Sequence, residues 1–186
     1  GTFSSAGVQS IKKMPAGTFD LIICSFALYF FTEMIPHIAR ILKKDGFFIA
    51  ITHDECNMEE LIIITRRTLE EHQWLASNQL LPIELILRQF STGNGEKLLG
   101  PYFGEIRKID FKNSLIFQPW EIDFFMDYYQ FKSPFFLTGT GADKNNIIEK
   151  LLHKLQDIGA ENKMITMCKD DTIFICSQPI TGGNTG

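Results

Sequence analysis

The residues best suited to chemistry are His53 and Asp54, which follow a predicted strand over Phe47–Thr52. Ligands of open α/β sheets bind outside the carboxyl ends of the strands, so both side chains are placed to face a substrate. Histidine side chains change charge near neutral pH, so His53 suits the role of a general base. We therefore predict His53 and Asp54 as catalytic residues. The alternative is an ordinary His-Asp pair in a solvated loop.

Two other groups of polar and aromatic side chains have simpler interpretations. Glu70–His72 offers three metal-ligating side chains, but nothing nearby in sequence completes the ligand set, so we predict a helix face and no metal. Tyr128, Tyr129 and Phe131 would suit a lid over an aromatic or lipid-like substrate. Aromatic residues at this spacing belong more often to a core.

The four cysteines show no metal-binding pattern. None lies in a CxxC or another zinc-like spacing. Cys24 and Cys176 stand inside apolar runs, where cysteine usually serves as a small buried hydrophobe. This usage indicates a reducing compartment, and we expect a cytoplasmic protein.

A strand, a helix and a second strand position the first candidate residues. The apolar run Phe19–Ser25 follows a turn at Pro15–Gly17 and predicts a strand buried on both faces. Thr32 is a suitable N-cap for a helix that Lys43–Gly46 would close. The next buried strand is Phe47–Thr52. Two parallel strands joined by a covering helix form a βαβ unit.

The rest of the chain adds helices and antiparallel strands. The segments Met164–Cys168 and Thr172–Ser177 bracket a turn and predict a hairpin. We predict the α/β class, with a mixed sheet and a C-terminal antiparallel hairpin. A single domain is expected over residues 1–180, with a disordered tail over 181–186. The other predicted elements are helices from Asn57, over Pro82–Phe90, Trp120–Gln130 and Ile147–Ile158, and extended segments over Glu105–Phe111 and Leu115–Gln118.

Composition excludes several classes of protein. The chain has 186 residues, is 45% hydrophobic and carries a formal net charge of −4. No cluster of Lys and Arg stands out to hold a phosphate backbone, so nucleic acid is not an expected partner. No apolar run approaches the roughly 18 residues of a membrane helix, so no membrane partner is expected either. The 17 Phe residues suit either a thick aromatic core or an apolar pocket.

Two stretches resemble a known family. Pro15–Tyr29, with its Phe-Asp-Leu-Ile strand, resembles the fourth-strand segment of class I S-adenosylmethionine-dependent methyltransferases. Those of the ubiquinone and menaquinone biosynthesis type (methyltransferase type 11) are most similar. Ile38–Phe47, with Arg-Ile-Leu-Lys before a glycine, is similar to the end of the helix that follows in that family. The close match covers roughly residues 8–55.

The resemblance implies a Rossmann-like fold, S-adenosylmethionine as cofactor and methyl transfer to a small molecule. Methyl transfer demands few protein groups, because the cofactor carries the reactive methyl. An aromatic side chain at the family's cofactor crevice could stack on the adenine or on the sulfonium. The residues at matching positions are Ser10, Ile11, Ser25, Phe26, Ala27 and Tyr29.

One departure from the family weakens the implied site. The glycine-rich Gly-x-Gly-x-Gly loop is absent, and the chain matches only the C-terminal two-thirds of such a domain, with the N-terminal strands missing. Half of the cofactor site would then be lacking, and Phe19–Ser25 would become a sheet edge. An apolar edge favours association, so we expect this strand to pair either with a second copy of the chain, as a homodimer, or with the missing half of the domain. The alternative function is a non-catalytic scaffold or partner-binding module with a methyltransferase-like fold.

Overall fold

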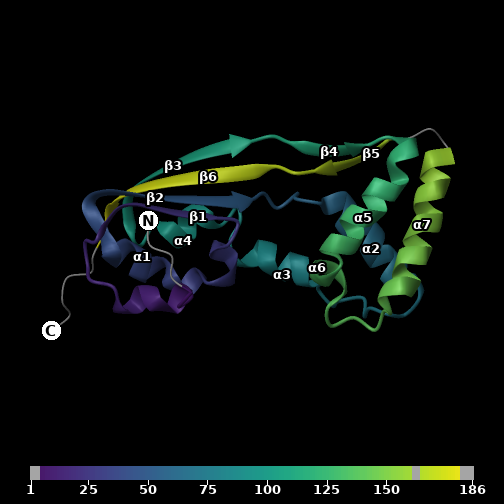
Figure 1. Cartoon of the computed structure of the whole chain (residues 1–186), viewed down its shortest axis with the longest axis horizontal. Helices are drawn as coiled ribbons and strands as arrows, with labels where there is room; N and C mark the ends of the chain where they lie inside the picture. The colour runs from purple at the N-terminus through teal and green to yellow at the C-terminus, as the bar shows by residue number, and fades with distance from the viewer. Residues whose placement is uncertain (1–4, 161–163, 181–186) are drawn as a thin grey trace. The chain divides into compact units, whose positions relative to one another are not determined.

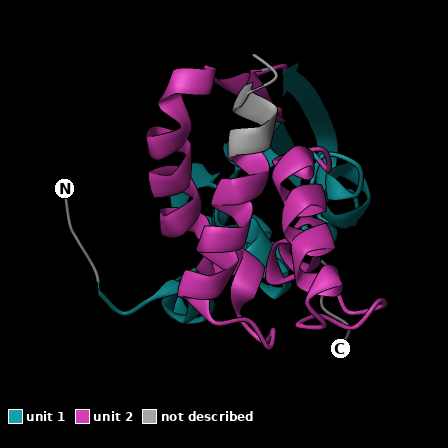
Figure 2. Ribbon diagram, turned by 90° about the vertical axis from the view of Figure 1, so that its right-hand side faces the viewer, with its two compact units in different colours: residues 1–54, 88–111, 171–186 teal, residues 55–87, 112–170 magenta. Residues whose placement is uncertain are grey.

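The computed structural model describes residues 5–160 and 164–180. The chain divides into two compact units, where the sequence indicates one domain (Figure 2). Unit 1 contains residues 1–54, 88–111 and 171–186, and unit 2 contains residues 55–87 and 112–170. Each unit has its own cluster of buried apolar side chains. The predicted tail over 181–186 lies outside the described residues.

Unit 1 is built on a four-stranded mixed sheet (Figure 1). The strand order is β1-β2-β6-β3, with β1 and β2 parallel and β6 antiparallel to both of its neighbours. This confirms the predicted α/β class with a mixed sheet. The elements of unit 1 are η1 (Val8–Lys13), β1 (Phe19–Ser25), η2 (Leu28–Phe30), η3 (Thr32–Met34), α1 (Ile35–Ile41), β2 (Leu42–His53), α4 (Gly95–Leu99), β3 (Phe103–Phe111) and β6 (Asp171–Pro179).

The sheet of unit 1 is packed on one face only. Phe48, Phe174 and Cys176 point to that face and are fully buried against the short helices. On the other face, Ile23 is 59% exposed and Phe47 is 48% exposed. The prediction that these strands are buried on both faces is therefore wrong. Apolar side chains line both faces, but the described elements of unit 1 cover only one of them.

The predicted helix end at Lys43–Gly46 is also wrong. The helix α1 ends at Ile41, and residues 43–46 belong to β2. The β1–β2 register shifts there, from Phe19 opposite Leu42 to Leu21 opposite Phe47. A Cβ on Gly46 would come within 3.0 Å of the Phe19 and Asp20 carbonyl oxygens. Gly46 therefore permits a close approach between strands and does not terminate a helix.

The expectation that Phe19–Ser25 forms a sheet edge is confirmed. The strand β1 lies at one end of the strand order and pairs only with β2 among the described residues. One row of its backbone groups thus has no ladder partner in the described sheet. Natural sheets usually protect such an edge, because it can pair with another chain.

Unit 2 is a helical unit with a short antiparallel strand pair. The strands β4 and β5 pair with each other, and β6 pairs within the sheet of unit 1. Each of the two C-terminal strands is antiparallel to its partners, but β5 pairs with β4 and β6 pairs with β2 and β3. The predicted hairpin between Met164–Cys168 and Thr172–Ser177 is therefore wrong, because the two strands belong to different sheets. An open cavity of about 460 Å³ is lined mostly by apolar side chains of α2, α5, α7 and β5. The elements are α2 (Glu59–Glu71), α3 (Pro82–Gln89, whose last two residues belong to unit 1), β4 (Ser114–Phe117), η4 (Pro119–Glu121), α5 (Ile122–Lys132), α6 (Pro134–Leu137), α7 (Lys144–Ala160) and β5 (Ile165–Cys168).

The cysteines fall into two groups. Cys176 is fully buried and Cys24 half-buried, and burial raises their thiol pKa values to about 12 and about 11. Cys56 and Cys168 form a disulfide that the sequence did not indicate, with 5.9 Å between their Cα atoms. Disulfides persist mainly in oxidising compartments, so the cytoplasmic location stays a prediction. Among the described residues, no helix is long and apolar enough to cross a membrane.

Candidate functional site

The candidate site lies at the carboxyl ends of β1 and β2 in unit 1. The parallel register pairs Ser25 with Ile51, so the two strands end at the same edge of the sheet. The antiparallel strand β6 begins at this edge and places Asp171 opposite His53. Ligands of open α/β sheets bind at this kind of edge. Pairing thus brings His53 and Asp171 together across 118 positions of sequence.

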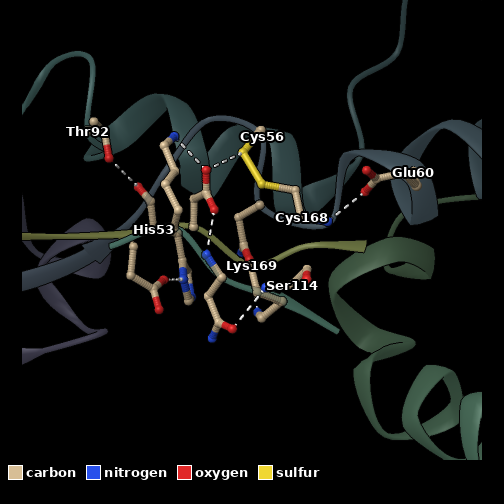
Figure 3. Close-up of a disulfide and its surroundings, with 12 residues drawn as sticks. His53, Cys56, Glu60, Thr92, Ser114, Cys168 and Lys169 are labelled. Carbon is tan, nitrogen blue, oxygen red and sulfur yellow. Dashed lines mark hydrogen bonds and ion pairs between the residues drawn. A yellow bond between two sulfur atoms is a disulfide. The ribbon is translucent and has the colours of Figure 1, made fainter. Parts of the chain in front are cut away.

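The imidazole of His53 is oriented by Asp171. His53 Nδ1 lies 2.7 Å from Asp171 Oδ1, and both side chains are largely buried. Because an ionised carboxylate only accepts hydrogen bonds, this contact places a proton on Nδ1 and makes Nε2 the basic nitrogen. The Thr92 amide donates to the His53 carbonyl at 3.2 Å and holds the backbone of this residue. The Thr92 hydroxyl donates to the same oxygen at 3.5 Å (Figure 3).

Two aromatic rings pack beside the imidazole. The Phe26 ring stacks on His53 with 4.7 Å between ring centroids, and Tyr29 lies 6.1 Å from it. Phe26 has φ 50°, a left-handed conformation that costs a residue with a side chain about 1–2 kcal/mol. Its amide donates to the Ile51 carbonyl at 2.9 Å, which anchors this turn to β2. Such strain persists where the surroundings enforce it, and it concentrates at functional sites.

The hydroxyl of Tyr29 stays protonated at neutral pH. Burial is the largest cause that raises the pKa of Tyr29, and the nearby Cys24 and Asp171 raise it further. A neutral phenol in this position is a hydrogen-bond donor. The site thus combines one oriented base, one phenolic donor and the exposed part of the Phe26 ring.

The structure separates the other predicted site residues into two places. Ser25 and Ala27 flank Phe26 at the end of β1, as predicted. Ser10 and Ile11 lie in η1, which contacts α1 and η3. The Ser10 hydroxyl donates to the Gly7 carbonyl at 2.7 Å, and the Ile11 carbonyl accepts from Arg40 at 3.1 Å. No strand precedes this segment among the described residues, so the position that the resemblance implies for them stays a prediction.

Sequence reasoning missed Asp171 as the partner of His53. Asp54 directly follows β2, and its predicted catalytic role is not tested by the geometry. In the sequence, Asp171 belongs to the predicted turn between Met164–Cys168 and Thr172–Ser177. Its signal was indirect: the first residue of a strand antiparallel to β2 must lie beside the last residue of β2.

The two groups with simpler interpretations lie on the helices α5 and α2 or directly after them. Tyr129 is fully buried in the core of unit 2, which favours the core interpretation, although Phe131 is exposed. His72 Nδ1 lies 2.9 Å from the Thr68 carbonyl, one turn earlier on the same helix. Glu71 accepts from Lys154 at 2.6 Å, and this lysine holds the pKa of Glu71 below its usual value. These residues form a helix face.

Comparison with known proteins finds similarity only to solved structures. No family model and no curated protein matches the sequence. A Bacillus halodurans protein described as a methyltransferase has 10% identity over 90% of this chain and 73% of its own, with a TM-score of 0.45. A Galdieria sulphuraria protein described as a sarcosine dimethylglycine methyltransferase has 13% identity over 90% and 56%, with a TM-score of 0.35. Haemonchus contortus phosphoethanolamine N-methyltransferase 2 has 11% identity over 90% and 35%, with a TM-score of 0.36.

These solved structures are all described as methyltransferases. The chain spans little more than half of the second protein and about a third of the third. At such TM-scores and identities, the similarity assigns no activity to this chain.

Proposed function

We propose that unit 1 contributes the base and one wall of a site for methyl transfer from S-adenosylmethionine to a small molecule. The observation that carries this proposal is the stack of Phe26 on His53, with Asp171 at 2.7 Å, at the carboxyl ends of β1 and β2. The sequence resemblance places the cofactor crevice at this edge. The antiparallel strand β6 beside the parallel pair of β1 and β2 also fits the predicted mixed sheet with a C-terminal antiparallel strand.

The residues present fit one side of the cofactor. Phe26 is 38% exposed, so part of its ring is available to stack on adenine or to face the sulfonium charge. The glycine-rich loop that would surround the methionine part is absent from the sequence. A second wall must therefore come from another segment or another chain, and the proposal assigns only the first wall to unit 1.

The chain's own residues would manage the proton of the acceptor. The cofactor supplies the reactive methyl when bound. The Nε2 atom of His53 accepts the proton that the acceptor group loses, and the Asp171 carboxylate stabilises the resulting imidazolium. The Tyr29 hydroxyl donates a hydrogen bond to the acceptor group and keeps this group in line with the methyl that is transferred. In-line methyl transfer gains mainly from this kind of positioning.

Calorimetric titration with S-adenosylmethionine tests the first wall. We expect the purified chain to bind the cofactor and Phe26→Ala to weaken binding by roughly 2- to 10-fold, because an aromatic stack contributes about 0.5–1.5 kcal/mol. Phe124→Ala, which removes an exposed ring from α5 in unit 2, should leave the affinity unchanged. If the wild-type chain does not bind, unit 1 alone is not a cofactor site.

The second candidate function is a non-catalytic, partner-binding module. One specific observation favours it: the sheet of unit 1 has both an edge strand and an apolar face that no element of unit 1 covers. Monomeric proteins rarely leave such a surface without a role. Failure of the chain to bind the cofactor, together with stable self-association, would favour this function.

We propose that the occupant of the β1 edge is a second copy of the chain. Two copies of one edge strand can pair antiparallel across a two-fold axis, which makes a closed and self-complementary interface. Leu21 and Ile23 are exposed on the uncovered face of β1 and would meet their counterparts there.

Introducing a charge on this strand should separate the copies. Ile23→Lys is expected to turn a dimer into a monomer at micromolar concentration, because like charges across a two-fold axis cost several kcal/mol. Light scattering at increasing concentration measures the mass. Leu85→Lys, on an equally apolar exposed position of α3, is the matched control and should remain dimeric. A monomeric wild-type chain at high concentration would overturn the proposal.

A further inference from the structure

Unit 2 brings three metal-ligating side chains together near the start of α2 and the end of β5. The ligand atoms of Cys56, Cys168 and Asp170 all lie within 4.8 Å of one another. Figure 3 shows the two cysteines joined as a disulfide. We propose that, after reduction of this disulfide, the three side chains bind one thiophilic divalent cation, with Zn²⁺ as the best fit.

Several hydrogen bonds hold the two cysteines close to each other, in addition to the disulfide. The Met58 amide donates to the Cys168 carbonyl at 2.8 Å. The Cys168 amide donates to Glu60 Oε2 at 2.9 Å (Figure 3). Next along the chain, Lys169 Nζ donates to the buried Asn57 Oδ1 at 2.9 Å. These three contacts join the segment around Cys56 to the end of β5. The two sulfur atoms should therefore remain neighbours when the bond between them is broken.

The carboxylate of Asp170 completes the cluster. Asp170 is only 9% exposed, and its Oδ1 accepts from the Asn113 amide at 2.8 Å. Its Oδ2 lies 3.7 Å from Cys56 Sγ and accepts from Lys112 Nζ at 2.6 Å. The Lys112 ammonium and the Asn113 amide hold the pKa of Asp170 below its usual value. An oxygen of this largely buried carboxyl group thus lies beside the sulfur pair.

The donor set favours zinc over other common cations. Two thiolates and one carboxylate carry three negative charges, and thiolates select soft or borderline metals. Magnesium and calcium require shells of oxygen ligands, which this cluster does not offer. Three protein ligands leave a fourth tetrahedral position for water. Lys112 is the local competitor for Asp170 Oδ2, but its side chain is 77% exposed and can move into solvent.

The disulfide and the bound metal exclude each other, because both use the same two sulfur atoms. A dithiol reductant supplies two electrons and two protons, which break the Cys56–Cys168 bond and give two thiols, while the reductant becomes a disulfide. Zn²⁺ then replaces the two thiol protons, which are released to solvent, and forms two metal–sulfur bonds. The oxidised chain has no thiolate in the cluster and should not bind the ion.

Titration of the reduced, full chain with Co²⁺ under anaerobic conditions tests the proposal. Co²⁺ is the probe because its thiolate charge-transfer absorption reports sulfur ligation and its visible bands report tetrahedral geometry. We expect one saturable site per chain, with the intensity of two thiolates, and displacement by Zn²⁺. The same chain oxidised to the disulfide should give no thiolate band. This comparison needs no mutation and therefore does not depend on how a variant folds.

Four variants assign the ligands. Cys56→Ser should remove the two-thiolate spectrum, and its far-ultraviolet circular dichroism should match that of the reduced, metal-free wild type, which also lacks the disulfide. Asp170→Asn keeps the shape of the side chain and should weaken binding by at least roughly tenfold. Lys112→Met removes the competing ammonium and should tighten binding by up to about fivefold, the value of an exposed ion pair. Cys24→Ser, in unit 1, is the matched control and should change nothing.

Three results would overturn the proposal. The first is the absence of saturable Co²⁺ binding by the reduced wild type. The second is a thiolate spectrum that survives in Cys56→Ser or disappears in Cys24→Ser. The third is wild-type affinity in Asp170→Asn, which would remove the carboxylate from the ligand set. None of these results depends on whether unit 1 binds S-adenosylmethionine.

Discussion

Replacement of Phe174 by alanine is expected to lower the free energy of unfolding of unit 1 by about 3–5 kcal/mol. Phe174 is fully buried on the covered face of β6 and packs edge-to-face against Phe90, with 5.7 Å between ring centroids. A Cβ on Gly95 would lie 2.4 Å from its Cζ atom, so the backbone of α4 fits closely against this ring. The cavity left by the substitution could not be filled without moving that helix.

The matched control is Phe47→Ala. Phe47 lies on the opposite face of the same sheet and is 48% exposed, so its truncation should cost less than about 1 kcal/mol. Urea unfolding followed by circular dichroism gives both values. Fluorescence reports unit 2 separately, because Trp74 and Trp120 both lie there. Equal losses in the two variants would mean that both faces of the sheet are packed, contrary to the structure.

The second large effect is expected at His53. If His53 is the base in methyl transfer, His53→Asn should lower kcat by roughly 10²- to 10⁴-fold, the usual contribution of a general base. Cofactor affinity should change much less, because the ring stacked beside Phe26 is replaced by a smaller planar group. The measurement is release of S-adenosylhomocysteine with an acceptor found by screening, with calorimetry of cofactor binding alongside it.

Two carboxylate variants decide which aspartate orients the imidazole. Asp171 contacts His53 Nδ1 at 2.7 Å, whereas Asp54 is its neighbour in sequence. Asp171→Asn should therefore lower kcat and shift its pH profile, and Asp54→Asn should do so much less. The opposite order would return the orienting role to Asp54. Unchanged kcat in His53→Asn would remove the base from the proposal altogether.

Local sequence determined most of the elements. The apolar run Phe19–Ser25 is the strand β1 with the predicted bounds, and the helices predicted over Pro82–Phe90 and Ile147–Ile158 correspond to α3 and α7. The periodicity of apolar residues reports such elements directly, because it reflects the geometry of one continuous segment. The bounds of α1 were less predictable, since Gly46 serves a close contact between strands that a local pattern cannot reveal.

The candidate site divides in the same way. His53 could be predicted because a strand end is visible in the sequence, whereas the resemblance to the methyltransferases implied Phe26 and Tyr29. Asp171 could not, because its place depends on the antiparallel pairing of β6 with β2. The Cys56–Cys168 contact, 112 positions apart, depends likewise on how the start of α2 meets the end of β5.

The sequence alone thus determined the strands, the helices and the polar residues that follow them, since each depends on neighbours within a few positions. Only the tertiary structure decided which face of the sheet is covered, which aspartate meets His53 and which cysteines meet each other. Burial and pairing are properties of two segments at once. An apolar residue such as Ile23 indicates that a face can be covered, but whether it is covered depends on segments far away in sequence, and Ile23 is 59% exposed.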